Sequence, residues 1–474
     1  MSIYLENYWP LYSEFIQATE ELKYRNIPLG LMVNFYQLID DELRSEMGST
    51  TFRQKLKHPG IDEQQEIQPF FERQLSPLYQ PVKSKLEGKI LINLDYIRIS
   101  EKTIREHFSG DQAMILSRSR ATELYGIPNI YSLDYKEDSR SVSEELIRQA
   151  ARIFAAYTNH PAFSNTFFCQ TFIQRIPAII DAIEMVCNLY QQIPVAAVMV
   201  GTTEDVVSRA LAVVAGMKGI PTVCLQHGIL MGEEAFMPVF TSYIGIYGQV
   251  EQDWYRERGV AAEQIVITGH PRYDDIFTAE PAAKKTFRET YGLDPHKITL
   301  LFATGPALDE TKVRELLTEL AAQPRFQLLI KPHPWELSKK RIALYTELAS
   351  IYANIHVVTD KKADTRALIM HSDAMVATVS TVALEGLLFG KPVFVYNFIQ
   401  ANREYLYYEA LERYTGKEPS ELTRIITRYY ASNLEKMNYR AVKNRFLEQA
   451  YQIRHSGRLL ADLLHALIHG RATL

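Results

Sequence analysis

The sequence predicts an α/β protein built from two doubly wound, Rossmann-like domains that face a cleft, with additional helices at both ends. Short, fully apolar runs alternate with helical segments, which is typical of parallel strands whose two faces are both covered by helices. The alternation occurs in two series, and residues 278–285 between them show little periodicity. We interpret residues 278–285 as a linker between the two domains.

The composition is that of a soluble globular chain. Of the 474 residues, 47% are hydrophobic and 23% are charged, and this length allows two or three domains. The 52 basic and 56 acidic residues give a net charge of −4, which argues against a dedicated nucleic-acid-binding protein. The apolar runs are much shorter than the ~20 residues that span a bilayer. With no signal-peptide pattern at the N-terminus and three scattered cysteines, we expect a cytoplasmic protein.

Residues 1–85 are predicted to be a helical N-terminal extension of the first domain. Aromatic residues at spacings of three and four, among them Tyr8, Tyr12 and Phe15, indicate an amphipathic helix. We expect this helix to cap the first domain. The alternative is a surface that faces a membrane or an acceptor.

The first domain is predicted to cover residues 86–277. Its helices are expected at 144–157, 177–190 and 205–218, with Pro177 at the first helical position, where a missing N–H costs nothing. Its strands are expected at 89–95, 113–117, 130–133, 195–201, 222–226, 243–247 and 264–268.

The second domain is predicted to cover residues 286–445, and residues 446–474 to form a C-terminal helix that packs back on the first domain. Within that tail, residues 459–468 are amphipathic and follow Arg454 and Arg458, so contact with a membrane surface is the alternative for this helix. The strands of the second domain are expected at 298–303, 326–330, 355–358, 374–377 and 392–396, and its helices at 311–322, 338–351 and 381–389.

The residues that follow each strand are the candidate ligand contacts, because ligands of doubly wound sheets bind beyond the carboxyl ends of the strands. In the first series, one strand ends in Gln226-His227-Gly228, and His227 can act there as a base or, when charged, can meet a phosphate. The alternative is a structural histidine that bonds a carbonyl group. At the end of this series, His270 and Arg272 are expected at the hinge between the domains, within reach of a ligand.

In the second series, Lys331 and His333 directly follow a strand, and two prolines fix the backbone around His333. Both side chains are candidate partners for a phosphate group, and a rigid turn with incidental basic residues is the alternative. Gly305 follows another strand, and the amide groups of its turn can approach a phosphate.

A third strand of this series leads into a helix that begins at Ser380 and Thr381. Hydroxyl groups and free amides at a helix N-terminus form a phosphate site, which the helix dipole strengthens. Glu385 lies four residues after Thr381, on the same face, where it can bond the hydroxyls of a ribose. The alternative is that Ser380 or Thr381 caps the helix and that Glu385 is solvated.

Several motifs are absent from the sequence. It has no Asp-x-Asp pair for a divalent metal, no phosphate-binding G-x-x-x-x-G-K-[ST] loop and no G-x-G-x-x-G dinucleotide motif. It also lacks a G-x-S-x-G nucleophile elbow. We therefore expect neither a bound metal nor a cofactor.

The sequence carries four motifs in order: GIPT leading to QHG (219–228), TGHPRYD (268–274), KPHP (331–334) and STVALEG followed by GKPV (380–393). Taken together, they resemble those of bacterial surface-polysaccharide transferases of the GT-B architecture. The similarity covers about residues 193–400, and the first 190 residues resemble no particular family. Similar groups are the capsule-synthesis transferases that use CMP-Kdo or CMP-sialic acid and the teichoic-acid glycerophosphotransferases that use CDP-glycerol.

The resemblance implies a role for each motif. His333 would contact the donor phosphate and stabilise its departure, and Ser380 and Thr381 would bind the same phosphate. Glu385 would hold the ribose, and His227 would serve as a base or on the acceptor side. Charge that develops on the departing phosphate would then meet these groups without a metal.

The acidic base of the family has several candidates in this chain. Glu204 and Asp205 follow one strand of the first domain, and Glu233 and Glu234 follow the His-Gly turn. The chain departs from the glycerophosphotransferases at positions 225–226, where it has Leu-Gln and they tend to have a tryptophan before His-Gly. This departure argues against a polyol phosphate donor.

We therefore expect a metal-independent glycosyltransferase that moves a sugar from a nucleotide-activated donor, preferably a CMP-sugar, to a growing surface polysaccharide or glycolipid. Its partners would be a CMP-, UDP- or CDP-linked donor and a saccharide or lipid-linked acceptor, and not nucleic acid. Peripheral contact with the inner face of the membrane is an open alternative to a purely cytoplasmic location. Three other functions stay open: a non-hydride sugar-nucleotide epimerase or hydrolase, a CDP-polyol phosphotransferase, and a non-catalytic scaffold with this fold.

Overall fold

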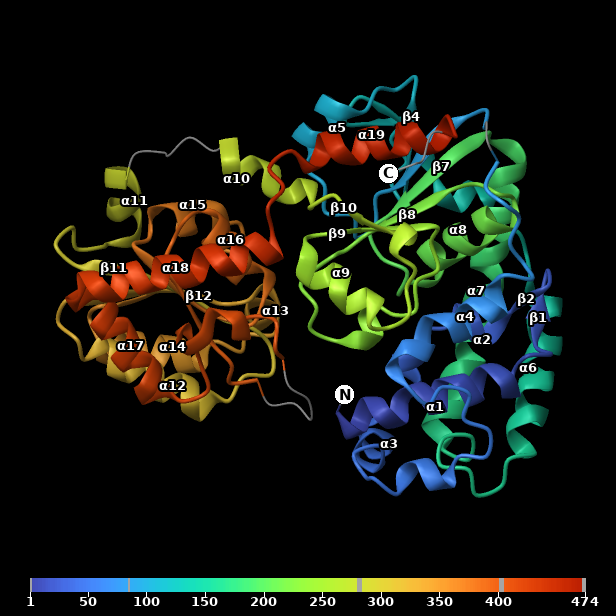
Figure 1. Ribbon diagram of the computed structural model, residues 1–474, viewed down its shortest axis with the longest axis horizontal. Helices are drawn as coiled ribbons and strands as arrows, with labels where there is room; N and C mark the ends of the chain where they lie inside the picture. Colours follow the sequence, from blue (N-terminus) through green and yellow to red (C-terminus); the bar gives the residue numbers. More distant parts are fainter. Residues whose placement is uncertain (1, 84–85, 279–283, 400–404, 471–474) are drawn as a thin grey trace. The chain divides into compact units, whose positions relative to one another are not determined.

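The computed structural model divides the chain into two compact units (Figure 1). Unit 1 comprises the chain up to His227, Gly232–Arg272 and the C-terminal segment from His455, and unit 2 comprises Gly228–Met231 and Tyr273–Arg454. The residues described by the structure are 2–83, 86–278, 284–399 and 405–470.

Apart from the short segment Gly228–Met231, the chain passes from unit 1 to unit 2 within the TGHPRYD motif, between Arg272 and Tyr273, and returns between Arg454 and His455. The crossing between Arg272 and Tyr273 therefore precedes the linker expected at 278–285, most of which lies outside the described residues.

Unit 1 is built on an eight-stranded sheet with the order β10-β9-β8-β7-β3-β4-β6-β5. All neighbouring strands in it pair in parallel except β5 and β6, which form an antiparallel edge. β7 and β8 are buried along their whole length, as expected of strands covered on both faces. The strands are β3 (Lys89–Asn93), β4 (Ala113–Ser117), β5 (Glu123–Leu124), β6 (Ile127–Tyr131), β7 (Val195–Val200), β8 (Thr222–Leu225), β9 (Tyr243–Ile246) and β10 (Ile265–Ile267).

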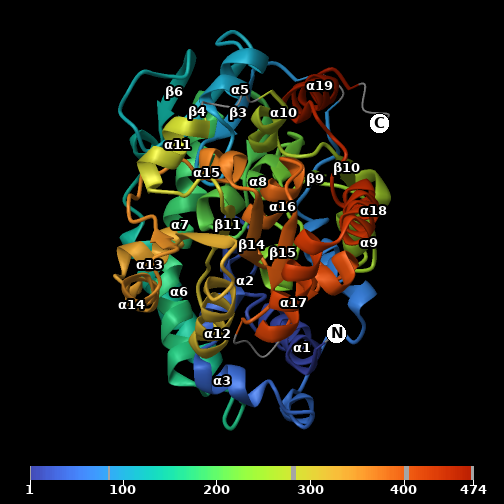
Figure 2. The same cartoon turned by 90° about the vertical axis from the view of Figure 1, so that its left-hand side faces the viewer.

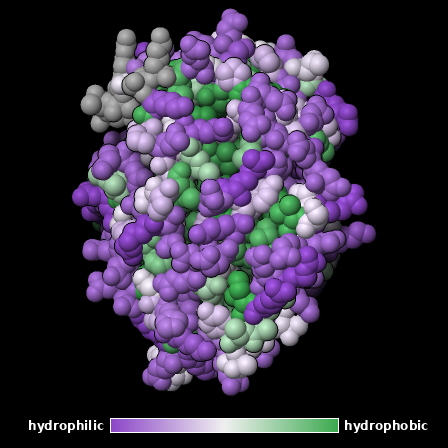
Figure 3. All heavy atoms as spheres, turned by 90° about the vertical axis from the view of Figure 1, so that its right-hand side faces the viewer, coloured by the Kyte–Doolittle hydropathy of each residue, from purple (hydrophilic) through white to green (hydrophobic). Residues whose placement is uncertain are grey.

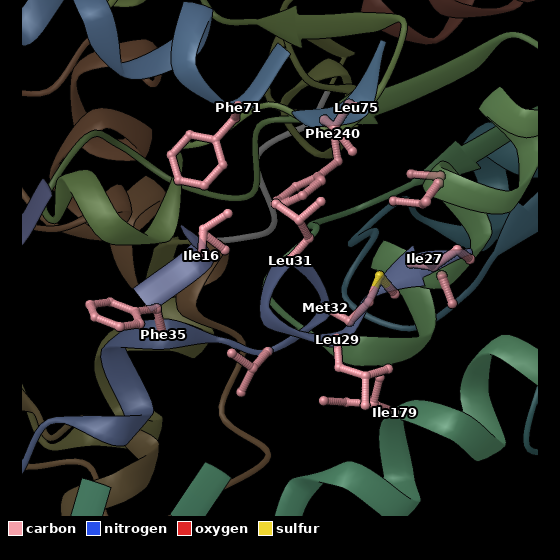
Figure 4. Close-up of a cluster of buried hydrophobic side chains, with 14 of the residues drawn as sticks. Ile16, Ile27, Leu29, Leu31, Met32, Phe35, Phe71, Leu75, Ile179 and Phe240 are labelled. Atoms are coloured by element: carbon pink, nitrogen blue, oxygen red, sulfur yellow. The ribbon is translucent and has the colours of Figure 1, made fainter. Parts of the chain in front are cut away.

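The N-terminal helices of unit 1 are part of its hydrophobic core. In α1 the rings of Tyr8, Tyr12 and Phe15 are almost fully buried, and Tyr12 stacks on Phe35 with ring centroids 4.3 Å apart. Figure 4 shows residues of α1, β2 and α2, together with Phe35, in one cluster with Phe240 and with Ile179 of α7 (Thr166–Gln192). The aromatic stripe therefore packs inward, and the alternative of a membrane-facing or acceptor-facing stripe is contradicted. These elements are α1 (Ile3–Ala18), β1 (Lys23–Tyr24), β2 (Ile27–Pro28), α2 (Leu29–Met32), α3 (Asp41–Glu46) and α4 (Ile67–Leu75).

One helix of unit 1 begins earlier than its proline suggests. α7 runs from Thr166 to Gln192, so Pro177 lies inside it rather than at its start. The helix starts where Asn165 caps it by accepting a hydrogen bond from the Phe168 amide at 2.9 Å. A long buried face that includes Phe172 and Ile176 offsets the hydrogen bond lost at Pro177. The other helices of the first series are α5 (Glu101–His107), α6 (Arg140–Ala155), α8 (Val206–Met217) and α9 (Gln249–Arg256).

The C-terminal helix, α19 (Ser456–Ile468), belongs to unit 1, where it lies beside α5 and β7 (Figure 1). Its leucines Leu460, Leu463, Leu464 and Leu467 are buried in one core cluster with the sheet. Apart from Leu459, which is 40% exposed, the leucines of residues 459–468 are therefore covered by protein, which contradicts the alternative that this face contacts a membrane. The tail expected at 446–474 is not one helix, because the preceding helix ends at Ala450.

Unit 2 is built on a six-stranded sheet, all parallel, with the order β13-β12-β11-β14-β15-β16 (Figure 2). Its strands are β11 (Ile298–Ala303), β12 (Phe326–Lys331), β13 (Ile355–Val357), β14 (Ala374–Thr378), β15 (Val393–Tyr396) and β16 (Thr415–Gly416). Its helices are α10 (Asp274–Thr278), α11 (Lys284–Tyr291), α12 (Glu310–Ala321), α13 (Pro334–Ser338), α14 (Ala343–Ile351), α15 (Thr365–His371), α16 (Thr381–Leu388), α17 (Pro419–Ala431) and α18 (Asn433–Ala450).

One face of the molecule is mainly hydrophilic (Figure 3). On the face drawn in Figure 3, hydrophobic residues show in separate areas between charged and polar ones. Within the described part of the chain, none of the helices combines the length and the apolar character that crossing a bilayer requires.

Candidate functional site

The carboxyl ends of the parallel strands of unit 1 bring several predicted residues together. Glu204 follows β7 and His227 follows β8, and these strands are neighbours in the sheet. The His227 Nε2 atom lies 3.7 Å from Glu204 Oε2. Arg98, which follows β3, donates from Nη1 to the His227 carbonyl at 2.9 Å. A histidine, a carboxylate and an arginine therefore share this edge of the sheet.

The His227 ring is held in a largely apolar setting. It stacks on Phe236, with ring centroids 4.8 Å apart and planes 12° apart. Burial, helped by the nearby Arg98 charge, lowers the pKa of His227 to about 4. The imidazole is therefore neutral at physiological pH. The His227 side chain is 21% exposed, which is enough for a substrate to reach it. A neutral, reachable imidazole can accept a proton.

Glu204 faces the same imidazole. Burial raises the pKa of Glu204, while Arg209 and a hydrogen bond with Asn34 act in the opposite direction. Its side chain is 37% exposed, so it is open to solvent as well as to His227. A carboxylate in this place can orient the imidazole and stabilise the positive charge that the ring acquires on taking a proton.

Asp205, the other acidic candidate after β7, caps a helix. It is the N-cap residue of α8, and its Oδ1 accepts a hydrogen bond from the Ser208 amide at 2.9 Å. This bond satisfies one of the amides that a helix leaves unpaired at its N-terminus. Of the two neighbouring carboxylates, Glu204 is thus the one that the structure places against His227.

Glu233 takes part in a buried ion pair. Its Oε2 lies 2.6 Å from Arg258 Nη2, and Trp9 of α1 donates its indole N–H to Oε1. Arg258 also lies over the Trp254 ring, 3.7 Å from its centroid. These contacts tie α1 to the middle of unit 1, so Glu233 is fully engaged in holding the fold. Glu234 is partly buried and contributes to raising the pKa of Glu204.

Replacing Glu233 with alanine is expected to lower the free energy of unfolding by about 3–5 kcal/mol, because it leaves the Arg258 guanidinium buried without its partner. Denaturant unfolding measures this loss. Glu257→Ala is the matched control, since Glu257 also lies near Arg258, at 3.6 Å, but is 66% exposed. Equal, small effects of the two substitutions would show that Glu233 is not a structural residue.

His270, which follows β10, is fully buried at the same edge of the sheet. Its Nδ1 accepts a hydrogen bond from the Arg272 amide at 3.1 Å. Burial, with the charges of Arg272 and Arg98 and the neighbouring His227, keeps the pKa of His270 well below its usual value. His270 is thus packed inside unit 1. Arg272 is the last residue of unit 1 before the chain enters the long segment of unit 2 that begins at Tyr273.

Two arginines that the motif analysis did not single out organise this edge. The buried Arg209 donates to the carbonyl of Thr203 at 2.7 Å and to that of Leu31 at 3.1 Å. It thereby ties the loop after β7 to the N-terminal helices. The second is Arg98. Its position after β3 marks it in the sequence as a candidate site residue, because the predicted site residues also follow strands. Arg209 lies inside a helix and carries no such signal.

In unit 2, Lys331 and His333 lie at the carboxyl end of β12. A hydrogen-bond network fixes this turn: the His333 amide donates to Thr304 Oγ1 at 2.9 Å and to Glu336 Oε2 at 2.8 Å, and Tyr345 donates to Glu336 Oε1 at 2.8 Å. His333 Nδ1 accepts from the Trp335 amide at 3.2 Å. Its Nε2 is thus the nitrogen left for a ligand.

Burial sets the titration of both basic groups. It lowers the pKa of Lys331, although Asp360 acts in the opposite direction, and it lowers the pKa of His333, although Glu336 acts in the opposite direction. Lys331 is buried, whereas His333 is only partly shielded from solvent and stays accessible. A phosphate bound here would add negative charge and favour the protonated form of each.

Ser380 and Thr381 follow β14 at the same edge of this sheet, where β11 separates β14 from β12. Ser380 is the N-cap residue of α16, but its side chain makes no capping bond and instead donates to the Thr378 carbonyl at 3.2 Å. Tyr408 donates to the Ser380 carbonyl at 2.7 Å. The alternative that Ser380 caps the helix is therefore contradicted.

The remaining donor candidates lie close by. A Cβ atom at Gly305 would meet Thr378 Cγ2 at 2.9 Å, so a glycine lets the loop after β11 approach the end of β14. Glu385 lies within α16 and is buried rather than solvated. Among the residues that the structure describes, no group of three or more His, Cys, Asp or Glu side chains could hold a metal ion.

The comparisons with known proteins agree with this fold. Residues 248–452 match the model of the CDP-glycerol:poly(glycerophosphate) glycerophosphotransferase family. This segment includes every donor candidate of unit 2. The match favours the CDP-polyol phosphotransferase alternative over the expected CMP-sugar transferase. A search of curated proteins finds no match.

Solved structures share the architecture at low sequence identity. UDP-GlcNAc 2-epimerase from Neisseria meningitidis, bound to UDP-GlcNAc, is 14% identical, with a TM-score of 0.53 and coverage of 80% of this chain and 99% of that one. A glycosyltransferase from Rickettsia africae is 13% identical, with a TM-score of 0.50 and coverage of 82% and 100%. MnaA from S. aureus with UDP is 12% identical, with a TM-score of 0.50 and coverage of 80% and 96%. The predicted fold class, two Rossmann-like parallel-sheet domains of the GT-B type, is confirmed.

Proposed function

We propose that this protein transfers a polyol phosphate from a CDP-linked donor, of which CDP-glycerol is the simplest, to a hydroxyl group of a surface-polymer acceptor. The observation that carries this proposal is the family match over residues 248–452, which includes Lys331, His333, Ser380 and Thr381. A donor nucleotide with two phosphates suits this set, because two basic side chains follow β12 and two hydroxyls follow β14, the strands on either side of β11.

The reaction is a displacement at phosphorus. The acceptor oxygen forms a bond to the β-phosphorus of the donor, the bond from that phosphorus to the bridging oxygen breaks, and CMP leaves with the electron pair. His227 takes the proton of the acceptor hydroxyl, and Glu204 stabilises the resulting imidazolium. Lys331, His333 and the hydroxyls of Ser380 and Thr381 meet the charge that develops on the phosphates.

The nucleotide that the protein prefers tests the donor class. We expect calorimetric titration in the presence of EDTA to show binding of CDP and CMP, and binding of UDP and GDP weaker by about tenfold or more, because pocket groups that pair with one base are left unpaired with another. Preference for UDP would contradict the proposal and favour a sugar-nucleotide epimerase. Absence of binding to all four nucleotides would favour a non-catalytic scaffold.

A CMP-sugar donor is the second candidate, because Leu225 and Gln226 precede His227 where the glycerophosphotransferases tend to have a tryptophan. In the structure, Leu225 and Gln226 are both buried, so neither residue presents a side chain to the surface. Product analysis separates the two: a sugar donor leaves its sugar on the acceptor without phosphate, and a CDP-polyol donor leaves a phosphodiester.

A further inference from the structure

One face of helix α18 in unit 2 is unusually apolar for an exposed surface. The helix packs inward through Tyr439, Val442 and Phe446. On its other side Leu434 is 66% exposed and Met437 is 67% exposed, the two highest values among the large hydrophobic side chains that the structure describes. Leu434 and Met437 are three residues apart, so they are neighbours on the helix surface. Two adjacent apolar side chains thus face away from the protein.

Cationic side chains flank these apolar residues. Lys436, Arg440 and Lys443 belong to the same helix, and none of them forms an ion pair within the described residues. By contrast, Arg445 of α18 pairs with Glu412 at 2.6 Å, and Arg314 of α12 pairs with Glu347 at 2.7 Å. The arginine and lysine charges beside Leu434 and Met437 are therefore available to an external anion.

A groove meets this surface at Lys443. It has a volume of about 440 Å³ and lies between α18 and the ends of α10 and α16. Leu387, Leu388 and Leu447 line it together with Phe277, and Lys443 and Arg454 stand at its edge; Glu448 is the one acidic residue among the residues lining it. The Arg454 guanidinium lies over the Phe277 ring, 5.5 Å from its centroid. An apolar groove with cations at its edge matches an amphiphile with an anionic head.

We propose that the α18 face (Leu434, Lys436, Met437, Arg440 and Lys443) and the adjoining groove dock on an anionic phospholipid membrane. Leu434 and Met437 enter the interface between head groups and acyl chains, and the cations meet lipid phosphates. The positive charges on this face are complementary to an anionic membrane surface. The leucines of α19, by contrast, are buried in the core of unit 1. The inference rests on the proposed function in one respect: a polymer acceptor carried by a membrane lipid would reach the protein at this face.

Flotation of the full chain with lipid vesicles tests this docking. The protein is expected to float with phosphatidylcholine vesicles that contain phosphatidylglycerol and to remain unbound with phosphatidylcholine alone. Changing Lys436, Arg440 and Lys443 to glutamate should weaken binding on the order of a hundredfold, because each cation near an anionic surface contributes roughly a factor of five. Changing Leu434 and Met437 to serine should weaken it by about tenfold.

The matched control reverses three exposed cations on α6 of unit 1, Arg140, Arg148 and Arg152, and so changes the net charge equally. This control should float as the unmodified chain does. Equal binding of the α18 variants and the unmodified chain would overturn the proposal, and so would equal losses in the α6 and α18 charge variants. Because flotation requires no catalysis, a chain that floats but transfers nothing would contradict the proposed function and support the docking surface.

Discussion

The substitution His227→Ala is expected to lower the rate of transfer by about a thousandfold, within the range that loss of a general base produces. The affinity for the donor nucleotide should change little, because the groups proposed to hold the donor phosphates are Lys331, His333, Ser380 and Thr381. Steady-state kinetics and calorimetry on the same preparation measure the two quantities. His58→Ala is the matched control, since His58 is an exposed histidine of unit 1. A His227→Ala protein that keeps its rate would exclude His227 as the base.

The pH dependence of the rate reports the state of this histidine. A base must be unprotonated to act, so activity is lost as the pH falls through its pKa. Because burial lowers the pKa of His227 to about 4, kcat/KM should stay level through neutral pH and decline only in the acid range. A decline centred at about 6.5, the ordinary value for histidine, would contradict this environment.

Glu204→Gln provides a second readout of the same pair. The glutamine keeps the shape of the side chain but removes the charge that stabilises the imidazolium, so we expect a smaller loss in rate, about tenfold. Removing the carboxylate also removes an attraction for the proton on His227, so the acid limb of the profile should move to lower pH. An unchanged profile would show that Glu204 does not act through His227.

The second large effect is expected at the donor side. His333→Ala should weaken the binding of CDP by about tenfold to a hundredfold, because it removes a hydrogen bond to a charged phosphate. The fold should stay intact, since the network around this turn uses the backbone amide of His333 together with Thr304 and Glu336. Calorimetric titration gives the affinity, and thermal unfolding checks the fold.

His296→Ala serves as the control for this experiment, because His296 is an exposed histidine of unit 2 that precedes β11. It should bind CDP as the unmodified chain does. If His333→Ala binds CDP with full affinity, the phosphates of the donor do not lie at the KPHP turn, and the assignment of Lys331 to the same site falls with it.

Much of the fold could be predicted from local patterns. Parallel strands buried on both faces leave continuous apolar runs, and β7 and β12 illustrate this, because they are buried along their whole length. The residues at the strand ends could be found for the same reason, and His227 next to Glu204 is the clearest case. Strand order then brings together groups that are far apart in the sequence.

Other features depend on contacts that no local pattern encodes. Glu233 and Glu204 both follow strands of the same sheet, yet Glu233 is engaged by Arg258 and by Trp9, more than 200 residues away in the sequence. The apolar stripe of α19 reads equally well as a membrane-facing or a core-facing surface, and only its packing decides between the two. Pro177 lies within a helix because tertiary packing outweighs a single lost hydrogen bond.

The central claim, transfer of a polyol phosphate, is tested most directly by phosphorus NMR of the full chain with CDP-glycerol and a short oligo(glycerol phosphate) acceptor. The account predicts that the CDP-glycerol signals are replaced by those of CMP and a new phosphodiester, in equal amounts and only when the acceptor is present. Stable CDP-glycerol, together with acceptor-dependent release of CMP from a CMP-sugar, would contradict it.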